Sequence, residues 1–258
     1  MEKIKVSVVM PTYNRARVIQ HAIRSVIDQT FKDWELIIVD DGSDDHTERI
    51  VKNFAYPKIV YHKAEHSGYV SKVRNIGNKL AKGDIIVVHD SDDVAFPDRL
   101  EEIVKCFEQH PYAEAVYHGM YLKFYDVYHD SIVRGIRPVR PYSKDHLLSE
   151  QYIPGQIAYK RHIIMRHPYD ERIRCCDDYQ MLLEFALNDV KFQPLYKNLY
   201  EYTDSPDSIN VHGEAVGWRR QDMKVICKDI LRGKYGIEAR AEMFKNTVDK
   251  NITSVDDL

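Results

Sequence analysis

Apolar residues in the first half of the chain form short continuous runs that alternate with stretches of helical spacing. The runs at 4–10, 35–39 and 85–89 are rich in Val and Ile, which predicts buried strands. Between them, apolar side chains at 16–29 and 71–81 recur every three or four residues, which predicts helices. Strands that alternate with helices favour a parallel sheet with helices on both faces.

Further segments continue this pattern and then depart from it. The additional predicted elements are a helix from Ser43 or Asp44 through Val51, a short strand at 59–61, helices at 97–109 and 177–187, and a strand at 113–121. Residues 125–150 show no clear periodicity, and we interpret them as a mobile functional flap, because so long a loop is seldom accidental. The tail at 215–248 is mostly amphipathic helix, interrupted around Gly233 and Gly236.

Length and composition narrow the classes of function. With 258 residues the chain can bury one large core, or one domain with a smaller appendage. A formal net charge of −3 with 30% charged residues gives no basic field for nucleic acid, so a small molecule is the favoured partner. No apolar stretch approaches the ~20 residues that span a bilayer. The four cysteines lack paired metal-ligand spacing and the chain opens without a signal-peptide pattern, so we expect a cytoplasmic setting.

The most informative segment is 83–93, where a β-branched apolar run leads directly into Asp90, Asp92 and Asp93. Carboxylates this close repel one another, and a hard divalent cation with a preference for oxygen ligands relieves the repulsion. A metal at the carboxyl end of a buried strand suggests phosphate chemistry. Ligands of such sheets bind beyond the carboxyl ends of the strands. Three strand ends therefore bring to one crevice Pro11-Thr12-Tyr13-Asn14, Asp40-Asp41-Gly42-Ser43 and Asp90-Ser91-Asp92-Asp93.

Sequence motifs in a fixed order carry a resemblance to a known family. They are Val-Val-Met-Pro-Thr-Tyr-Asn-Arg at 8–15, Ser-Val-Ile-Asp-Gln-Thr-Phe-Lys-Asp-Trp-Glu-Leu-Ile-Ile-Val-Asp-Asp-Gly-Ser-Asp-Asp at 25–45, Arg74-Asn75 with Ala81-Lys82-Gly83-Asp84, and His-Asp-Ser-Asp-Asp at 89–93 with Pro97 and Leu100. Together they resemble the family 2 glycosyltransferases of GT-A fold. The match is close over roughly residues 1–120 and resumes near 153–187.

The resemblance implies an α/β fold of GT-A type, with a Rossmann-like, mostly parallel sheet, helices on both faces and a C-terminal helical extension. It implies an inverting enzyme that moves a sugar from a nucleotide diphosphate donor to an acceptor hydroxyl of a glycan or lipid-linked glycan. We expect the GT-A domain at 1–210 and the extension at 211–258. Within the domain, 1–110 would bind the nucleotide and 111–210, with the flap 125–150, would bind the acceptor.

The resemblance also assigns residues to the donor site. The predicted nucleotide-sugar-binding residues are Pro11, Thr12, Tyr13, Asn14, Asp41, Arg74, Asp90, Ser91 and Asp92. Tyr13 and Asp41 match the positions that hold the base, and their chemistry suits uracil: an aromatic face can stack on a pyrimidine and a carboxylate can accept its imide N–H. Thymidine and guanosine diphosphate sugars are the alternative donors. Asp90 and Asp92 match the family's metal motif for Mn²⁺ or Mg²⁺, with Asp92 as the direct ligand and Asp90 nearer the ribose.

An inverting displacement needs a base that takes the acceptor's proton, and we predict Asp178 for this role. Asp177-Asp178-Tyr179 stands where the family carries its Glu-Asp pair. The chain departs from the family nearby, because Arg166-His167-Pro168-Tyr169-Asp170-Glu171 replaces the usual Gly-Gly-Phe-Asp-Glu. It also lacks the Gln-x-x-Arg-Trp sequence of processive synthases, which favours a single transfer per encounter.

Plainer explanations exist for each feature taken alone. Asp40 to Ser43 could be an ordinary turn, Arg74 a surface ion-pair residue, and Asp178 a helix cap. At the level of function, the alternatives are a nucleotide-sugar-binding module without turnover and a Mg²⁺-dependent phosphoacceptor signalling domain, which predicts about half this length. A dinucleotide dehydrogenase is disfavoured, because no Gly-x-Gly-x-x-Gly follows the first strand. The basic, aromatic tail could contact the inner face of a membrane, although packing onto the core is the commoner fate of such a helix.

Overall fold

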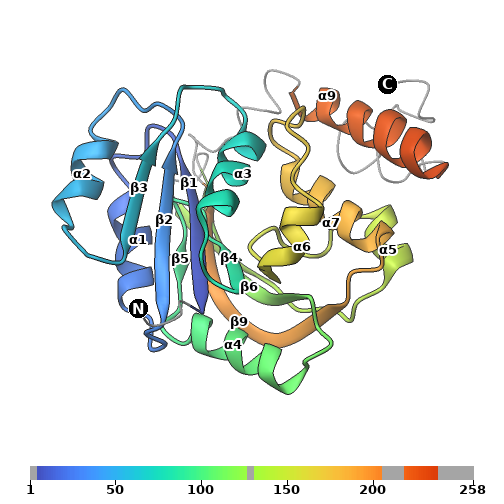
Figure 1. Cartoon of the computed structure of the whole chain (residues 1–258), viewed down its shortest axis with the longest axis horizontal. Coiled ribbons are helices and arrows are strands. Elements are labelled where there is room, and N and C mark those ends of the chain that lie inside the picture. The colour runs from blue at the N-terminus through green and yellow to red at the C-terminus, as the bar shows by residue number, and fades with distance from the viewer. Residues whose placement is uncertain (1–4, 127–130, 205–217, 238–258) are drawn as a thin grey trace.

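The structure is a computed structural model that describes residues 5–126, 131–204 and 218–237. In its first half, strands and helices alternate as the hydrophobic pattern predicts (Figure 1). The elements are β1 (Val6–Thr12), α1 (Ile19–Ile27), β2 (Trp34–Asp40), α2 (Thr47–Asn53), β3 (Ile59–Lys63), α3 (Val70–Leu80), β4 (Ile85–Val88), β5 (Val94–Ala95) and α4 (Arg99–Gln109).

The second half adds antiparallel strands and a group of helices on one side of the sheet. Its elements are β6 (Ala115–Asp126), β7 (Ser131–Arg137), α5 (Lys144–Ser149), β8 (Ala158–Lys160), α6 (Arg161–Arg166), α7 (Asp177–Leu187), β9 (Phe192–Asp204), α9 (Trp218–Lys224) and a π-helix, η1 (Val225–Lys234), that continues α9.

All strands of the described residues belong to one mixed sheet in the order β3-β2-β1-β4-β8-β6-β9-β5, with β7 paired to β6. Strands β1 to β4 are parallel to one another, and β6 is parallel to β9. The antiparallel pairs are β4 with β8, β8 with β6, β5 with β9 and β6 with β7. The predicted α/β fold with a mostly parallel sheet is therefore confirmed.

Helices cover both faces of the sheet, and alternate residues of the buried strands serve the two cores. Val9, Ile37 and Val88 point to the core that contains α6, α7 and η1. Their neighbours Val8 and Leu36 point to the other core, which contains residues of α1 and α4. Because both faces are buried, these strands appear in the sequence as continuous apolar runs.

Two predictions about the limits of regular structure need correction. The first strand does not end at residue 10 but continues through Pro11 to Thr12, because β4 pairs with β1 only as far as Val9 and Pro11 needs no N–H toward it. The stretch 125–150 is not an irregular flap where the structure describes it. There β6 extends to Asp126, β7 pairs antiparallel with it, and α5 is capped by Ser143, whose Oγ accepts the His146 N–H. Residues 127–130 lie outside the described residues.

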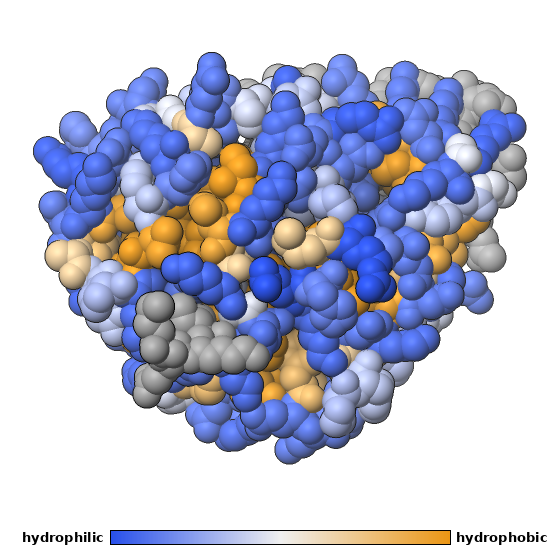
Figure 2. Space-filling view, in the orientation of Figure 1, coloured by the Kyte–Doolittle hydropathy of each residue, from blue (hydrophilic) through white to orange (hydrophobic). Residues whose placement is uncertain are grey.

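The predicted C-terminal helix is confirmed between 218 and 234. It continues through Gly233 without the predicted interruption there, and Gly236 follows it in a left-handed conformation with φ +65°. Its apolar side chains pack into the core of α7; they are Met223, Ile226, Cys227, Ile230 and Leu231. Residues 215–217 and 238–248 of the predicted helix lie outside the described residues. The face seen in Figure 2 is mostly hydrophilic. No helix of the described residues has both the length and the apolar character that a bilayer span requires.

Candidate donor and catalytic site

A cavity of about 810 Å³ lies at the carboxyl ends of β1 and β4 and is bordered by α7, α9 and the strands β6 and β9. Every one of the predicted site residues lines it: Pro11, Thr12, Tyr13, Asn14, Asp41, Arg74, Asp90, Ser91, Asp92 and Asp178. The cavity thus gathers residues from segments that are up to about 170 positions apart in the chain, as expected for ligand sites at the strand ends of parallel sheets.

Tyr13 and Asp41 meet at one end of the cavity, together with the loop 66–68. The Tyr13 ring stacks on His66, with 4.3 Å between the ring centroids and 21° between the planes. The Asp41 carboxylate accepts hydrogen bonds from Ser67 N and Oγ, both at 2.9 Å, and from Gly68 N at 2.8 Å. Asp41 therefore organises this loop in the structure, and its contact with a nucleotide base stays a prediction.

Asn14 completes the turn after β1. Its φ of 51° lies in the left-handed region, which asparagine tolerates better than most residues. Its N–H donates to Ser43 Oγ at 2.8 Å, and its Oδ1 accepts the Asp44 N–H at 3.1 Å. The first and second motifs are therefore tied to each other beside the cavity.

Arg74 is buried and joins two acidic segments. Its guanidinium donates to Asp90 Oδ1 at 2.8 Å and to Asp177 Oδ2 at 2.6 Å. Burial disfavours the Asp90 anion, but Arg74 and a hydrogen bond from Gln156 Nε2 outweigh it and lower the pKa of Asp90. At Asp177 burial dominates, and with the nearby carboxylates it raises the pKa to about 7 in spite of Arg74.

The repulsion among the three carboxylates after β4 is relieved by protein groups and not by a metal at two positions, Asp90 and Asp93. Asp90 is paired with Arg74, as described. Asp93 is fully buried, does not line the cavity, and accepts the Thr203 N–H at 2.8 Å. Burial, together with Asp92 and Asp90, raises the pKa of Asp93 well above its usual range, which favours its neutral form. Carboxylate repulsion alone is thus weaker evidence for a cation than the sequence suggested.

Asp92 is the carboxylate whose position fits a hard divalent cation. It lines the cavity, and Arg15 Nε lies 3.6 Å from its Oδ2. Mg²⁺ and Mn²⁺ bind carboxylate oxygens, and such ions are commonly held by one or two carboxylates together with substrate phosphates. Asp92 therefore offers a chemically suitable donor for such an ion, whereas both oxygens of Asp90 accept hydrogen bonds from Arg74 and Gln156. Among the described residues, the only preformed cluster of three metal-ligand side chains is a different one, Cys175, Cys176 and Asp222.

Asp178 lies in the first turn of α7 and reaches the cavity. Gln151 Nε2 donates to its Oδ2 at 2.7 Å. Gly155 packs against the same carboxylate so closely that an added Cβ would lie 2.5 Å from Asp178 Oδ2. Gln151 and Gly155 therefore fix the side chain between them.

Another part of the cavity wall is a β-ribbon of β6, β7 and β9. Met120, Leu122 and Phe124 on β6 line it, with Arg137 on β7 and Tyr202 on β9. Arg137 pairs in register with Met120, so its positive charge lies beside the apolar residues of β6. The wall combines apolar surface with one positive charge.

Several lining residues could not be found from the sequence. Examples are His66, Gln151, Gly155, Gln156 and Trp218. They lie in loops or at the first turn of a helix, where hydrophobic periodicity gives no signal. Pro154-Gly155 marks a turn in the sequence, but nothing there indicates that the glycine faces a carboxylate.

Comparisons with known proteins bear on this arrangement. The family model described as Glycosyl transferase family 2 matches residues 7–182. A curated relative, the putative glycosyltransferase EpsE of Bacillus subtilis, is 30% identical over 222 residues, which cover 79% of this chain and 74% of EpsE.

Solved structures share the fold. The crystal structure of S. aureus TarS 1-349 in complex with UDP-GlcNAc superposes with a TM-score of 0.63 at 18% identity, covering 90% of this chain and 73% of TarS. The mannosyltransferase PcManGT from Pyrobaculum calidifontis, in complex with GDP-Man and Mn²⁺, superposes with a TM-score of 0.62 at 19% identity. The match covers 85% of this chain and 62% of that structure.

Proposed function

The chain belongs to glycosyl transferase family 2 and is a glycosyltransferase, and from this premise we propose that it transfers a sugar from a UDP-sugar, with inversion, to a hydroxyl of a glycan or lipid-linked glycan. The observation that carries the proposal is the single cavity that all predicted donor-site residues and Asp178 line. TarS, which has the same fold, was solved with UDP-GlcNAc. PcManGT was solved with GDP-Man, so the guanosine donor class is the alternative for the nucleotide.

The donor would lie along the motifs at the strand ends. The nucleotide base stacks on Tyr13, whose ring already holds the planar His66 side chain at stacking distance. The ribose lies next to Asp90, which Arg74 and Gln156 hold in place. The diphosphate would reach Asp92, which would be the direct ligand of Mn²⁺ or Mg²⁺, with Asp90 nearer the ribose. Such an ion would supply positive charge to offset the charge that develops on the departing nucleotide diphosphate.

The protein's own contribution to the chemical step centres on Asp178. Its carboxylate takes the proton of the acceptor hydroxyl as that oxygen attacks the anomeric carbon. Gln151 orients the carboxylate through a 2.7 Å hydrogen bond. Arg74 contacts Asp177 and Asp90 simultaneously. It therefore holds α7, which carries the general base Asp178, in a fixed position relative to the segment that binds the sugar donor.

The acceptor would approach along the ribbon of β6, β7 and β9. Met120, Leu122 and Phe124 offer apolar contact, and Arg137 offers a positive charge next to them. This combination suits a lipid-linked glycan with a phosphate group. The predicted membrane contact of the C-terminal helix would have to use its exposed side, where Lys228 and Arg232 lie, because its apolar residues are buried in the core.

Replacement of the base tests the proposal. The Asp178→Asn variant keeps the shape of the side chain but cannot take a proton, so transfer from a UDP-sugar is expected to fall by about 10²- to 10⁴-fold. Binding of UDP with Mn²⁺, measured by calorimetry, is expected to stay near that of the wild type. Asp189→Asn is the matched control, because the Asp189 side chain is exposed, pairs with Lys144 at 3.1 Å and does not line the cavity.

Two outcomes would contradict the proposal. If the wild type binds UDP-sugars but transfers none of them to any acceptor or to water, the chain is a binding module. If Asp178→Asn retains the wild-type rate, another group is the base.

A further inference from the structure

The C-terminal helix is bound to α7 by polar as well as apolar contacts. Lys234 Nζ lies 2.6 Å from Glu184 Oε1 on α7. Arg172, in the loop before α7, lies 3.0 Å from Asp229. The apolar side of α9 and η1 is buried in the same core as α7. The extension thus packs firmly against α7 and the loop before it, which belong to the predicted acceptor-binding half.

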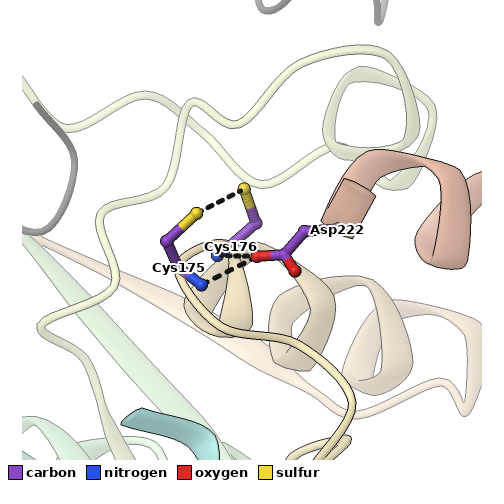
Figure 3. Close-up of side chains that lie close together, drawn as sticks. All are labelled: Cys175, Cys176 and Asp222. Atoms are coloured by element: carbon purple, nitrogen blue, oxygen red, sulfur yellow. Dashed lines mark hydrogen bonds between the residues drawn. The ribbon is translucent and has the colours of Figure 1, made fainter. Parts of the chain in front are cut away.

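One carboxylate of this extension is aimed at the backbone just before the catalytic helix. Asp222, on α9, is 3% exposed. Its Oδ2 accepts the Cys175 N–H at 2.7 Å and the Cys176 N–H at 3.0 Å (Figure 3). Both of its oxygens lie 3.1 Å from the Arg174 N–H. Three consecutive peptide groups therefore donate to a single buried side chain.

These peptide groups lie where α7 begins. Cys176 is the N-cap residue, its side chain makes no capping hydrogen bond, and Asp177 and Asp178 are the first two residues of the helix. The N–H groups at the start of a helix need acceptors, and a negative charge there is stabilised by the helix dipole. Asp222 supplies both an acceptor and a negative charge, although it lies on a helix more than 40 residues away in the chain.

A second contact holds the same backbone from the side. The Arg174 guanidinium lies over the Tyr69 ring at 4.5 Å and over the Trp218 ring at 4.7 Å. Tyr69 and Trp218 both line the cavity. The segment 174–176 is therefore fixed between the start of α3 and the start of α9.

We propose that Asp222 is a positioning residue for catalysis: it fixes the start of α7 so that Asp178 faces the donor. The proposal rests on the function proposed above. Asp222 acts through the backbone of 174–176 and does not touch the substrate. The C-terminal helix thereby becomes a requirement for the rate of transfer and not only for stability.

A metal site made of Cys175, Cys176 and Asp222 is the competing explanation, because their ligand atoms lie within 4.8 Å of one another. The hydrogen-bond geometry favours the positioning role, because the Asp222 oxygens are directed at backbone N–H groups and charge-assisted bonds of this kind are strong.

The experiment compares the full chain with Asp222→Asn, Asp222→Ala and Lys228→Gln. Asp222→Asn keeps the shape and one acceptor oxygen but removes the charge. Lys228→Gln is the control, because Lys228 is an exposed residue of η1 that does not line the cavity. Steady-state kinetics and calorimetry with UDP and Mn²⁺ are measured well below each variant's melting temperature. We expect kcat to fall by about tenfold in Asp222→Asn and by about 100-fold in Asp222→Ala, because small displacements of a reacting group have effects of this size. The donor Kd should be unchanged.

The possible results separate the two levels of the proposal. A merely structural role would lower the melting temperature but leave kcat per folded molecule at the value of Lys228→Gln. That result would overturn the positioning role, while wild-type transfer and its loss in Asp178→Asn would still support the function. No transfer by the wild type would overturn both. Titration with Cd²⁺ alone provides a further test. A stoichiometric thiolate charge-transfer band that is lost in Asp222→Asn would establish the metal site instead.

Discussion

Gly155 has no side chain, and this leaves room for the Asp178 carboxylate. A Cβ on Gly155 would lie 2.5 Å from Asp178 Oδ2 and 2.6 Å from its Cβ, far inside van der Waals contact. In Gly155→Ala the carboxylate must move, so kcat is expected to fall on the order of 10²-fold. Binding of UDP with Mn²⁺ should be unaffected, because Gly155 lies on the Asp178 side of the cavity.

Gly135→Ala is the matched control for this substitution. Its added Cβ would lie 3.7 Å from the Leu122 side chain, an ordinary contact. Steady-state kinetics of both variants test the prediction. A wild-type kcat in Gly155→Ala would show that the position of the Asp178 side chain is not critical.

Asp177 gives the molecule a measurable pH dependence. Its pKa is raised from 3.8 to about 7, chiefly by burial. A carboxyl group whose pKa is higher in the folded than in the unfolded protein stabilises the fold most when the pH lies below the pKa of the unfolded state. For Asp177 that pKa is 3.8, and the stabilising contribution is lost as the pH rises through about 7. In Asp177→Asn this titration is absent.

Urea unfolding at several pH values measures the effect. Between about pH 4 and about pH 7, the free energy of unfolding of the wild type should decrease relative to that of Asp177→Asn. Curves that stay parallel over this range would contradict the raised pKa of Asp177.

Residue by residue, the site was predictable where motifs follow buried strands. Tyr13, Asp41 and Asp92 come directly after runs whose position in the sheet is fixed by apolar residues, so their convergence could be foreseen. The partners Gln151 and Gly155 could not be foreseen, because their contacts depend on the packing of a loop against α7. The same holds for Asp222.

At the scale of elements, the end of β4 is held by a buried cation on α4. Arg99 is 1% exposed, and it donates to Val88 O at 3.0 Å, to Gln156 O at 2.9 Å and to His118 Nε2 at 2.9 Å. Burial lowers its pKa to about 10, so it remains charged at neutral pH. Burial and the Arg99 charge also lower the pKa of His118 to about 3, which keeps its ring neutral and able to accept this bond.

Arg99→Met is therefore expected to reduce the free energy of unfolding by about 3 kcal/mol, because it leaves buried acceptors without donors. The substitution should also weaken binding of the nucleotide-sugar donor, since Val88 and Gln156 flank Asp90, which is a predicted donor-site residue. Denaturant unfolding and calorimetry test both effects, with Arg49→Met on the exposed side of α2 as the control. A loss below about 1 kcal/mol would mean that the network is rearranged at little cost.

The sequence revealed some elements and not others, for physical reasons. Strands β1, β2 and β4 were predictable, because they are buried on both faces and appear in the sequence as continuous apolar runs. The ribbon strand β7 exposes Ile132 and Ile136 and interleaves them with arginines, so it resembles an irregular polar segment. Helix α5 has only six residues, too few for a clear period.

At the scale of the whole molecule, the cavity lies between residues of the two predicted halves of the GT-A domain. Residues 1–110 contribute Tyr13, Asp41 and Asp92, and residues 111–210 contribute Arg137 and Asp178. The two halves share one sheet, because β8 and β6 continue it beyond β4. A ligand that bridges the halves should therefore stabilise the entire fold.

This gives a prediction that needs no knowledge of the sugar or the acceptor. A ligand present at about 100 times its Kd adds about 2.7 kcal/mol to the free energy of unfolding, which for a chain of this size corresponds to a rise in Tm of about 5–10 °C. We expect this rise with UDP and Mn²⁺ together and a much smaller one with either alone, because Asp92 and a diphosphate would together supply the oxygen ligands that such an ion prefers. Asp92→Asn should remove the dependence on Mn²⁺, whereas Asp189→Asn should retain it. An equal rise with UDP in the presence of EDTA would show that the nucleotide binds without a metal, and Arg15, 3.6 Å from Asp92, would then be the cation that meets the diphosphate.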